Sequence, residues 1–143
     1  MYKVIVFAGT TEGYEISRFL GENQIPVLAC VATEYGSRSL KESSSLHVQA
    51  GRLDENEMKE LFSREKPELV LDATHPYAAE VTRNIRKACE EAEVSYTRIL
   101  RTGSGQQNAV YVKDTQAAAE YLKGTTGNVL LTTGSKELAA FTS

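Results

Sequence analysis

Short apolar runs alternate with amphipathic helical patterns along most of this chain, and this alternation is the feature that most restricts its fold. The first run, KVIVFA at residues 3–8, is rich in β-branched and aromatic side chains, which is typical of a strand buried on both faces of a parallel sheet. After it, Ile16, Phe19 and Leu20 recur at the spacing of one helical face. Repetition of this unit predicts an α/β fold, in which a doubly wound, Rossmann-like parallel sheet is covered by helices on both faces.

The same patterns place the remaining elements. We expect strands at residues 3–8, 27–32, 46–50, 68–72, 95–100, 109–112 and 128–133. We expect helices at residues 12–22, between Asp54 and Pro67, at residues 78–92 and 115–123, and a last one that has begun when the sequence ends at Ser143. Asp54 followed by Glu57 predicts a capping box. The polar, Gly- and Ser-rich stretch at residues 33–45 is expected to be an exposed loop.

The composition excludes several classes of protein. With 41% hydrophobic and 24% charged residues over 143 positions, the chain is expected to bury one core and to be neither disordered nor fibrous. Sixteen basic against 19 acidic residues give a net charge of −3, which argues against a nucleic-acid binder. No apolar run approaches the ~18 residues of a membrane span, and the N-terminal run is too short for a signal peptide, so we expect no membrane partner.

Cys30 and Cys89 are the only cysteines, and they lie far apart without metal-ligand spacing. We expect both to be small, buried, apolar side chains in a reducing, cytoplasmic compartment, and we expect no metal site. His47 lies within a short predicted strand and is expected to be structural or at the surface.

Ligands of doubly wound sheets bind beyond the carboxyl ends of the strands, so the residues directly after each apolar run are the candidate site. The first such loop is GTTEG at residues 9–13. Gly9 allows a tight turn and the close approach of a ligand, and the N–H groups that enter the next helix form an anion site assisted by the helix dipole. A phosphate group is the expected ligand of this site, although an ordinary strand-to-helix turn has the same pattern.

The loop after the second strand bears on the choice of cofactor. Ser37 and Arg38 offer a site for a ribose phosphate, which favours NADPH, whereas Glu34 could accept hydrogen bonds from the free ribose hydroxyls of NADH. A solvated loop with an unrelated arginine is a third interpretation. The sequence therefore leaves NADPH preferred and NADH open.

The loop after the fourth strand, DATHPYA at residues 72–78, is the most unusual stretch of the chain. Thr74, His75 and Tyr77 make it rich in hydrogen-bond donors and acceptors for its size. Pro76 biases His75 toward an extended backbone and fits the first turn of the following helix. His75 is therefore a candidate site residue, with a purely local hydrogen-bonding role as the alternative.

Basic residues follow the later strands. An anionic ligand could meet four arginines that follow two neighbouring strands, and Lys136 follows the last expected strand in the same way. Solvated helix faces are the alternative interpretation. The four arginines are Arg83, Arg86, Arg98 and Arg101.

Together, these features resemble the precorrin-6A reductase family of cobalamin (vitamin B12) biosynthesis. Four motifs match the family in order and spacing over essentially the whole chain: GTTEG at residues 9–13, GRLD at 51–54, DATHPYA at 72–78 and LLTTGSKEL at 130–138, with Phe141. Ala8 departs from the family, which often has a second glycine there. The resemblance implies an NAD(P)H-dependent oxidoreductase that saturates one double bond of a conjugated tetrapyrrole precursor, with or without cobalt in the ring.

The resemblance also implies roles for single residues. Cofactor contacts would come from Gly9, Thr10, Thr11, Glu12, Ser37, Arg38, Thr74 and His75. Contacts to the tetrapyrrole substrate would come from His75, Pro76, Tyr77, Arg98, Arg101, Ser135 and Lys136. The basic residues among these would bind the carboxylates of the macrocycle. No residue is assigned as catalytic, because the protein chiefly aligns hydride donor and acceptor and excludes water.

Members of this family continue into a second α/β domain of comparable size. We therefore expect a nucleotide-binding domain at residues 1–127 and the start of a second domain at residues 128–143, which makes this chain an N-terminal portion. We also expect the chain by itself to self-associate through uncovered apolar residues and not to turn over substrate.

Two other functions remain open. A short-chain dehydrogenase or epimerase would need a Tyr-x-x-x-Lys pair, but Tyr77 is followed at this spacing by Val81, and Tyr121 by Thr125. The other is a non-catalytic nucleotide-sensing domain, which nucleotide binding without reductase activity would favour.

Overall fold

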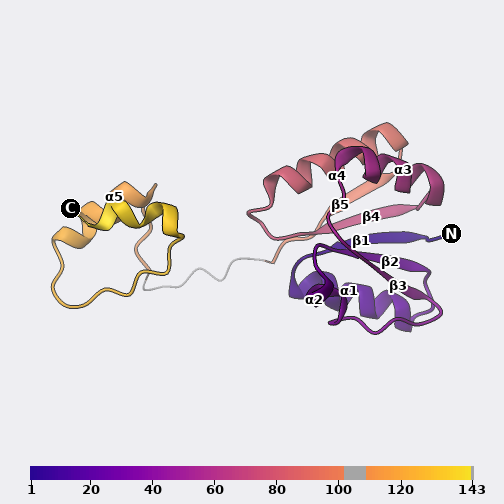
Figure 1. Cartoon of the computed structure of the whole chain (residues 1–143), viewed down its shortest axis with the longest axis horizontal. Helices are drawn as coiled ribbons and strands as arrows, with labels where there is room; N and C mark the ends of the chain where they lie inside the picture. Colours follow the sequence, from indigo (N-terminus) through magenta and orange to yellow (C-terminus); the bar gives the residue numbers. More distant parts are fainter. Residues whose placement is uncertain (102–108, 143) are drawn as a thin grey trace. The chain divides into compact units, whose positions relative to one another are not determined.

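The computed structural model describes residues 1–101 and 109–142. Contacts within the chain divide it into two compact units, Met1–Thr102 and Gly103–Ser143, and each unit is described by itself. The first unit contains the sheet and its covering helices, whereas the second contains two short helices (Figure 1).

Five parallel strands form the sheet of the first unit, in the order β3-β2-β1-β4-β5. They are β1 (Val4–Ala8), β2 (Val27–Val31), β3 (Leu46–Ala50), β4 (Leu69–Ala73) and β5 (Ser95–Arg98). The central strand, β1, is buried along its whole length and pairs in register with both neighbours, Val4 opposite Val27 and Leu69. The predicted doubly wound parallel sheet is confirmed.

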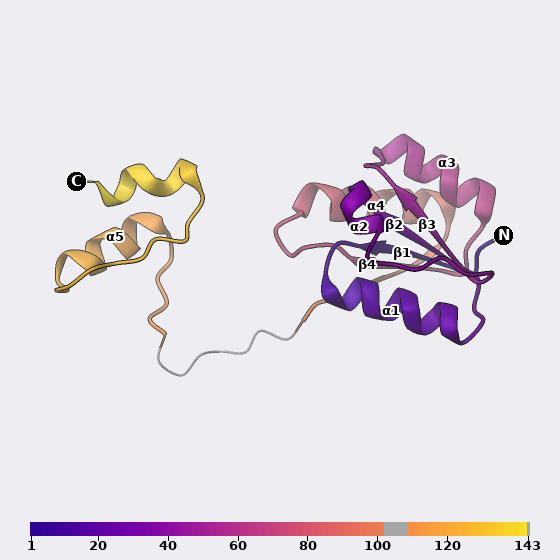
Figure 2. The same cartoon turned by 60° about the horizontal axis from the view of Figure 1, so that its bottom comes forward.

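Helices cover both faces of this sheet (Figures 1 and 2). One face carries α1 (Thr11–Glu22) and α2 (Glu34–Ser37), and the other carries α3 (Glu55–Glu65) and α4 (Ala79–Ala92). Side chains of β1 alternate between the two resulting cores, since successive residues of a strand point to opposite faces. In the core beneath α3, the rings of Phe7 and Phe62 pack edge to face, with centroids 6.1 Å apart.

The ends of α3 follow the sequence signals closely. Asp54 accepts a hydrogen bond from the Glu57 backbone N–H at 2.8 Å, and the Glu57 carboxylate accepts one from the Asp54 N–H at 2.7 Å, which confirms the capping box. Lys66 ends the helix in the left-handed region with φ of 47°, directly before Pro67.

Several predicted elements are wrong or displaced. Residues 33–45 were expected to be loop, but α2 forms there because the Thr33 hydroxyl accepts a hydrogen bond from the Gly36 N–H at 3.1 Å. β5 ends at Arg98, before the expected end at Leu100. Phe19 is 60% exposed, because α1 packs on the sheet through small residues, Gly13 and Ser17, that allow a close approach.

The second unit contains α5 (Thr115–Lys123) and a 3₁₀ helix, η1 (Ser135–Phe141). The strands expected at residues 109–112 and 128–133 are wrong, since both segments are irregular. A strand needs a partner for its backbone N–H and C=O groups, and no strand lies within residues 109–142. The domain boundary expected after residue 127 stays a prediction.

Both cysteines are free and buried, as expected. Burial raises the pKa of the Cys30 thiol, and of the Cys89 thiol, to about 12. Across residues 1–101 and 109–142, no helix combines the length and the apolar character that crossing a membrane requires.

Candidate functional site

The strand order creates a switch point between β1 and β4. From β1 the chain winds outward through β2 to β3, and it then returns to β4 on the other side of β1 and continues to β5. The loops that follow β1 and β4 therefore lead to helices on opposite faces of the sheet. In doubly wound sheets the ligand crevice lies at this position, so the two loops form the candidate site.

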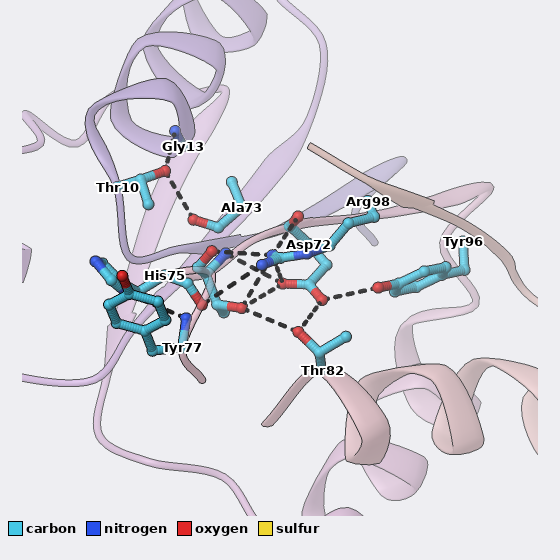
Figure 3. A network of polar contacts seen from close by, with 10 residues as sticks. Thr10, Gly13, Asp72, Ala73, His75, Tyr77, Thr82, Tyr96 and Arg98 are labelled. Carbon is cyan, nitrogen blue, oxygen red and sulfur yellow. Dashed lines mark hydrogen bonds and ion pairs between the residues drawn. The ribbon is translucent and has the colours of Figure 1, made fainter. Parts of the chain in front are cut away.

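The loops after β1 and β4 contact each other directly (Figure 3). The Ala73 carbonyl accepts a hydrogen bond from the Gly9 N–H at 3.2 Å and another from the Thr10 hydroxyl at 2.8 Å. Thr10 also caps α1, because its hydroxyl oxygen accepts from the Gly13 N–H at 3.4 Å. One threonine thus fixes the first turn of α1 against the end of β4.

Two glycines allow close backbone contacts in this arrangement. A Cβ added at Gly9 would lie 3.3 Å from the Thr74 Cα, and a Cβ added at Gly13 would lie 2.8 Å from the Ala8 Cα. The first spacing brings the two loops together, and the second brings α1 down onto β1. The N–H groups at the start of α1 consequently lie at the carboxyl edge of the sheet, where the helix dipole favours an anion.

Asp72, at the end of β4, is fully buried, and its carboxylate accepts five hydrogen bonds. Its carboxylate receives the Thr74 N–H at 3.1 Å and the Thr74 hydroxyl at 2.7 Å. The Thr82 and Tyr96 hydroxyls each donate at 2.8 Å, and Arg98 Nη1 donates at 2.9 Å (Figure 3). Three elements, β4, α4 and β5, therefore meet on one carboxylate.

These bonds keep Asp72 ionised. Burial alone would raise the pKa of its carboxyl, but the hydrogen bonds from Thr74, Thr82 and Tyr96 outweigh burial and hold the pKa below its ordinary value. The pKa of Tyr96 shifts the other way, because burial and the hydrogen bond to Asp72 both favour its neutral phenol.

Arg98 spans the backbone of the β4–α4 loop. Its side chain is 16% exposed, and Nη1 donates to the Thr74 carbonyl at 2.9 Å as well as to the Asp72 carbonyl at 3.1 Å. Nη2 reaches the His75 carbonyl at 3.4 Å. The guanidinium is thus engaged within the fold, and the expected contact of Arg98 with a substrate stays a prediction.

His75 and Tyr77 lie at the exposed edge of this loop. The Tyr77 backbone N–H donates to His75 Nδ1 at 3.2 Å, and the two ring centroids are 4.9 Å apart. Tyr77 is 90% exposed, and Pro76 between them is also exposed. All three residues are exposed, and substrate and nicotinamide contacts are expected here from the sequence analysis.

Glu12 and Arg101 join the first loop to the segment after β5. Their side chains form an ion pair at 2.6 Å. The backbone N–H at the start of α1 and the nearby Arg101 guanidinium lower the pKa of the Glu12 carboxyl. Arg101 is exposed and retains access to a ligand, whereas the Arg86 guanidinium lies over the Tyr96 ring at 5.3 Å from its centroid.

The remaining predicted site residues lie in other loops. Ser37 and Arg38 end α2 at the carboxyl edge, where the Ser37 hydroxyl donates to the Glu34 carbonyl at 2.7 Å and Arg38 is exposed. Ser135 and Lys136 begin η1 in the second unit, and both are exposed. Over the described ranges, the structure places no group of three or more His, Cys, Asp or Glu side chains where they could hold a metal ion.

The comparisons with known proteins agree with the fold. A protein-family profile described as precorrin-6x reductase CbiJ/CobK matches residues 3–143. A cobalt-precorrin-6A reductase of Methanocaldococcus jannaschii is 31% identical over 84% of this chain and 49% of its own length. The corresponding enzyme of Salmonella typhimurium is 32% identical over 96% of this chain and 54% of its own.

A solved structure, CobK precorrin-6A reductase, superposes with a TM-score of 0.68 at 25% identity, covering 84% of this chain and 48% of that one. The chain thus spans about half the length of the curated relatives it matches.

Proposed function

This chain belongs to the precorrin-6x reductase family CbiJ/CobK, and from this membership we propose that it takes part in reducing one double bond of a tetrapyrrole precursor, precorrin-6A or cobalt-precorrin-6A, in cobalamin biosynthesis. The observation that carries the proposal is the pairing of this membership with a switch point at which two loops converge beside a helix N-terminus. The proposed substrate is either the metal-free or the cobalt-containing ring.

The nucleotide in this proposal is NADPH, with NADH as the alternative. The N-terminal turn of α1 suits the diphosphate, which is proposed to bind at residues 9–12. Ser37 and Arg38 are proposed to meet the adenosine ribose, and Thr74 and His75 the nicotinamide. When bound there, the nicotinamide supplies the hydride that the conjugated ring accepts.

The contribution of the chain is to bind and to orient. Thr10 holds the α1 turn against β4, and the Asp72 network holds the following loop, so the two loops are fixed before ligand arrives. The tetrapyrrole carboxylates are proposed to meet Arg101 and Lys136, with Arg98, Ser135, Pro76 and Tyr77 as further contacts. No residue is assigned as the proton donor.

Turnover is proposed to depend on parts of the longer relatives to which this chain does not align, because alignment and exclusion of water require a closed cleft. Leu130 is 88% exposed and Val129 is 51% exposed, and these apolar side chains favour self-association of the chain when it is alone.

Introducing a negative charge at Thr10 tests the nucleotide site. Thr10→Asp retains an acceptor for the α1 cap but places a carboxylate where the diphosphate is proposed to bind. Two like charges about 4 Å apart repel by about 4 kcal/mol near a protein surface. We therefore expect the dissociation constant for NADPH, measured by fluorescence titration, to rise by about tenfold or more.

Thr10→Asn is the matched control, because asparagine has the shape of aspartate, can cap α1 and can donate to the Ala73 carbonyl. Its NADPH affinity should stay within about threefold of the parent chain. Equal affinities of the Asp and Asn variants would place the diphosphate elsewhere. Nucleotide binding by a complete family member without reductase activity would instead favour a sensing role.

Removing the charge of Arg38 tests the choice between the two nucleotides. Arg38→Ala is expected to weaken NADPH by about tenfold and NADH by less than about threefold, because a charge-assisted bond to the additional phosphate is lost. Arg64→Ala removes the same charge from the C-terminal turn of α3, at the opposite edge of the sheet, and should change neither. If Arg38→Ala weakened the binding of NADPH and NADH equally, Arg38 would not account for a preference for NADPH.

A further inference from the structure

The His75 ring is held in one orientation by its own loop. Nδ1 accepts a hydrogen bond from the Tyr77 backbone N–H at 3.2 Å, an arrangement that in the neutral imidazole places the proton on Nε2. The His75 carbonyl accepts from the Ala78 N–H at 2.9 Å, which closes the turn into α4. The ring is exposed, and it therefore presents an Nε2–H donor to solvent or to a ligand.

A single side chain from β5 holds the backbone of that loop. The Arg98 guanidinium donates to the carbonyls of Asp72, Thr74 and His75, at 3.1, 2.9 and 3.4 Å. Nη1 makes the first two of these contacts and Nη2 the third, so the carbonyls are shared between two nitrogens of one planar group, whereas lysine has a single nitrogen. Because Asp72 also accepts from Arg98 at 2.9 Å, the guanidinium is itself fixed by a fully buried carboxylate.

Figure 3 shows how these groups lie: Arg98 and Asp72 meet on the inner side of the loop, and His75 and Tyr77 lie at its outer end. Gly9 lies against the same loop, since a Cβ there would be 3.5 Å from the His75 N and 3.3 Å from the Thr74 Cα. The backbone of His75, whose ring is exposed, therefore lies beside Gly9, which directly precedes the Thr10 cap of α1.

We propose that Arg98 is a positioning residue, which fixes the β4–α4 loop so that His75 presents its Nε2–H to an oxygen acceptor of a nucleotide bound at the switch point. Arg98 does this through three backbone carbonyls and without touching the nucleotide itself. The inference rests on the proposed function for the identity of the ligand. The geometry of the loop can be tested without any ligand.

The first measurement is amide hydrogen exchange in the free chain. Arg98→Lys keeps the charge beside Asp72 but removes the planar set of donors, so we expect the Tyr77 and Ala78 amides to exchange at least about tenfold faster, with the β1 and β2 amides unchanged. Tyr96→Phe is the matched control, because it removes one hydrogen bond to Asp72 and leaves every Arg98 contact in place. There, the Tyr77 and Ala78 exchange rates should stay within about threefold of the parent chain.

Arg98→Gln, a neutral donor, is measured alongside, so that the test survives if one substitution prevents folding. Unchanged exchange in a folded Arg98 variant would overturn the proposal, as would an equal acceleration in Tyr96→Phe. Nitrogen-15 spectra of the imidazole rings give a direct check, because the sequence has only two histidines and His47→Gln leaves only His75. A substantial population of the Nδ1–H form near pH 8, where free imidazole is neutral, would also overturn it.

The second measurement is NADPH titration. The folded Arg98 variant should bind NADPH about tenfold more weakly than the parent chain, and Tyr96→Phe should bind it equally. Faster loop exchange with unchanged NADPH affinity would overturn the role of His75 toward the nucleotide. If the parent chain itself binds no NADPH, the proposed function fails, and the exchange data still decide whether Arg98 positions the loop.

Discussion

Replacing Asp72 with alanine is expected to lower the free energy of unfolding by about 3–5 kcal/mol. The substitution removes a carboxylate that is fully buried and leaves the Arg98 guanidinium, 16% exposed, without its counter-charge. It also leaves the hydroxyls of Thr82 and Tyr96 without the acceptor that each uses at 2.8 Å. Urea unfolding followed by circular dichroism measures the change.

Glu55→Ala is the matched control, because Glu55 is also a paired carboxylate but lies at the surface. It bonds Lys59 at 2.6 Å and Lys87 at 3.3 Å, with 28% of its side chain exposed. Surface ion pairs contribute about 0–1 kcal/mol, so the control should lose no more than that. If Asp72→Ala were no more destabilising than Glu55→Ala, the buried network would not stabilise the fold.

Asp72→Ala is also expected to change how the free energy of unfolding depends on pH. Because hydrogen bonds hold the folded-state pKa of Asp72 below its ordinary value despite burial, the unfolded chain binds more protons than the folded one below about pH 4. The stabilisation from Asp72 is therefore fully present above the ordinary pKa and is lost as the pH falls through the folded-state value. The difference in the free energy of unfolding between the parent chain and Asp72→Ala should therefore decrease as the pH falls through that range.

The sheet and its main helices could be predicted from sequence because their signals are local. The run at residues 3–8 and the capping box at Asp54 are each specified by a few neighbouring residues. The segment at residues 128–133 has an equally apolar pattern, but no strand forms there, because an apolar run becomes a strand only when another strand pairs with its backbone. Sequence periodicity indicates the tendency of a segment to form a strand, but it does not indicate whether another strand is available to pair with it.

The candidate site likewise has a part that local sequence signals identify and a part that depends on contacts between distant segments. Residues 9–13 and 72–78 were identified because each loop follows its own strand directly, and their positions need only the parallel order. The partners of Asp72 were missed, since Arg98 reaches it only through the β4–β5 register, in which Asp72 lies opposite Arg98, and Thr82 only through the packing of α4. An aspartate at the end of an apolar run was the one available signal of a buried network.

Replacing Gly13 with alanine is the second substitution with a large expected effect, a loss of about 1–3 kcal/mol in the free energy of unfolding. Alanine by itself favours a helix interior over glycine by about 1 kcal/mol, so packing must outweigh propensity here. The added Cβ would lie 2.8 Å from the Ala8 Cα and 3.0 Å from the Ala73 Cβ. Ala8 belongs to the central strand, which is paired on both sides by β2 and β4 and cannot yield.

The helix must therefore move instead, and its N-terminal turn moves with it. We expect Gly13→Ala to weaken NADPH binding as well as to lower the midpoint of urea unfolding, because the Thr10 cap and the N–H groups at the start of α1 shift away from the Ala73 carbonyl. Gly134→Ala makes the same chemical change where a Cβ would meet nothing within 4 Å, and it should alter stability by no more than about 0.5 kcal/mol. A Gly13→Ala chain as stable as the parent would show that α1 does not need its close contact with β1, and the anion site would then lack the geometric basis on which the nucleotide proposal depends.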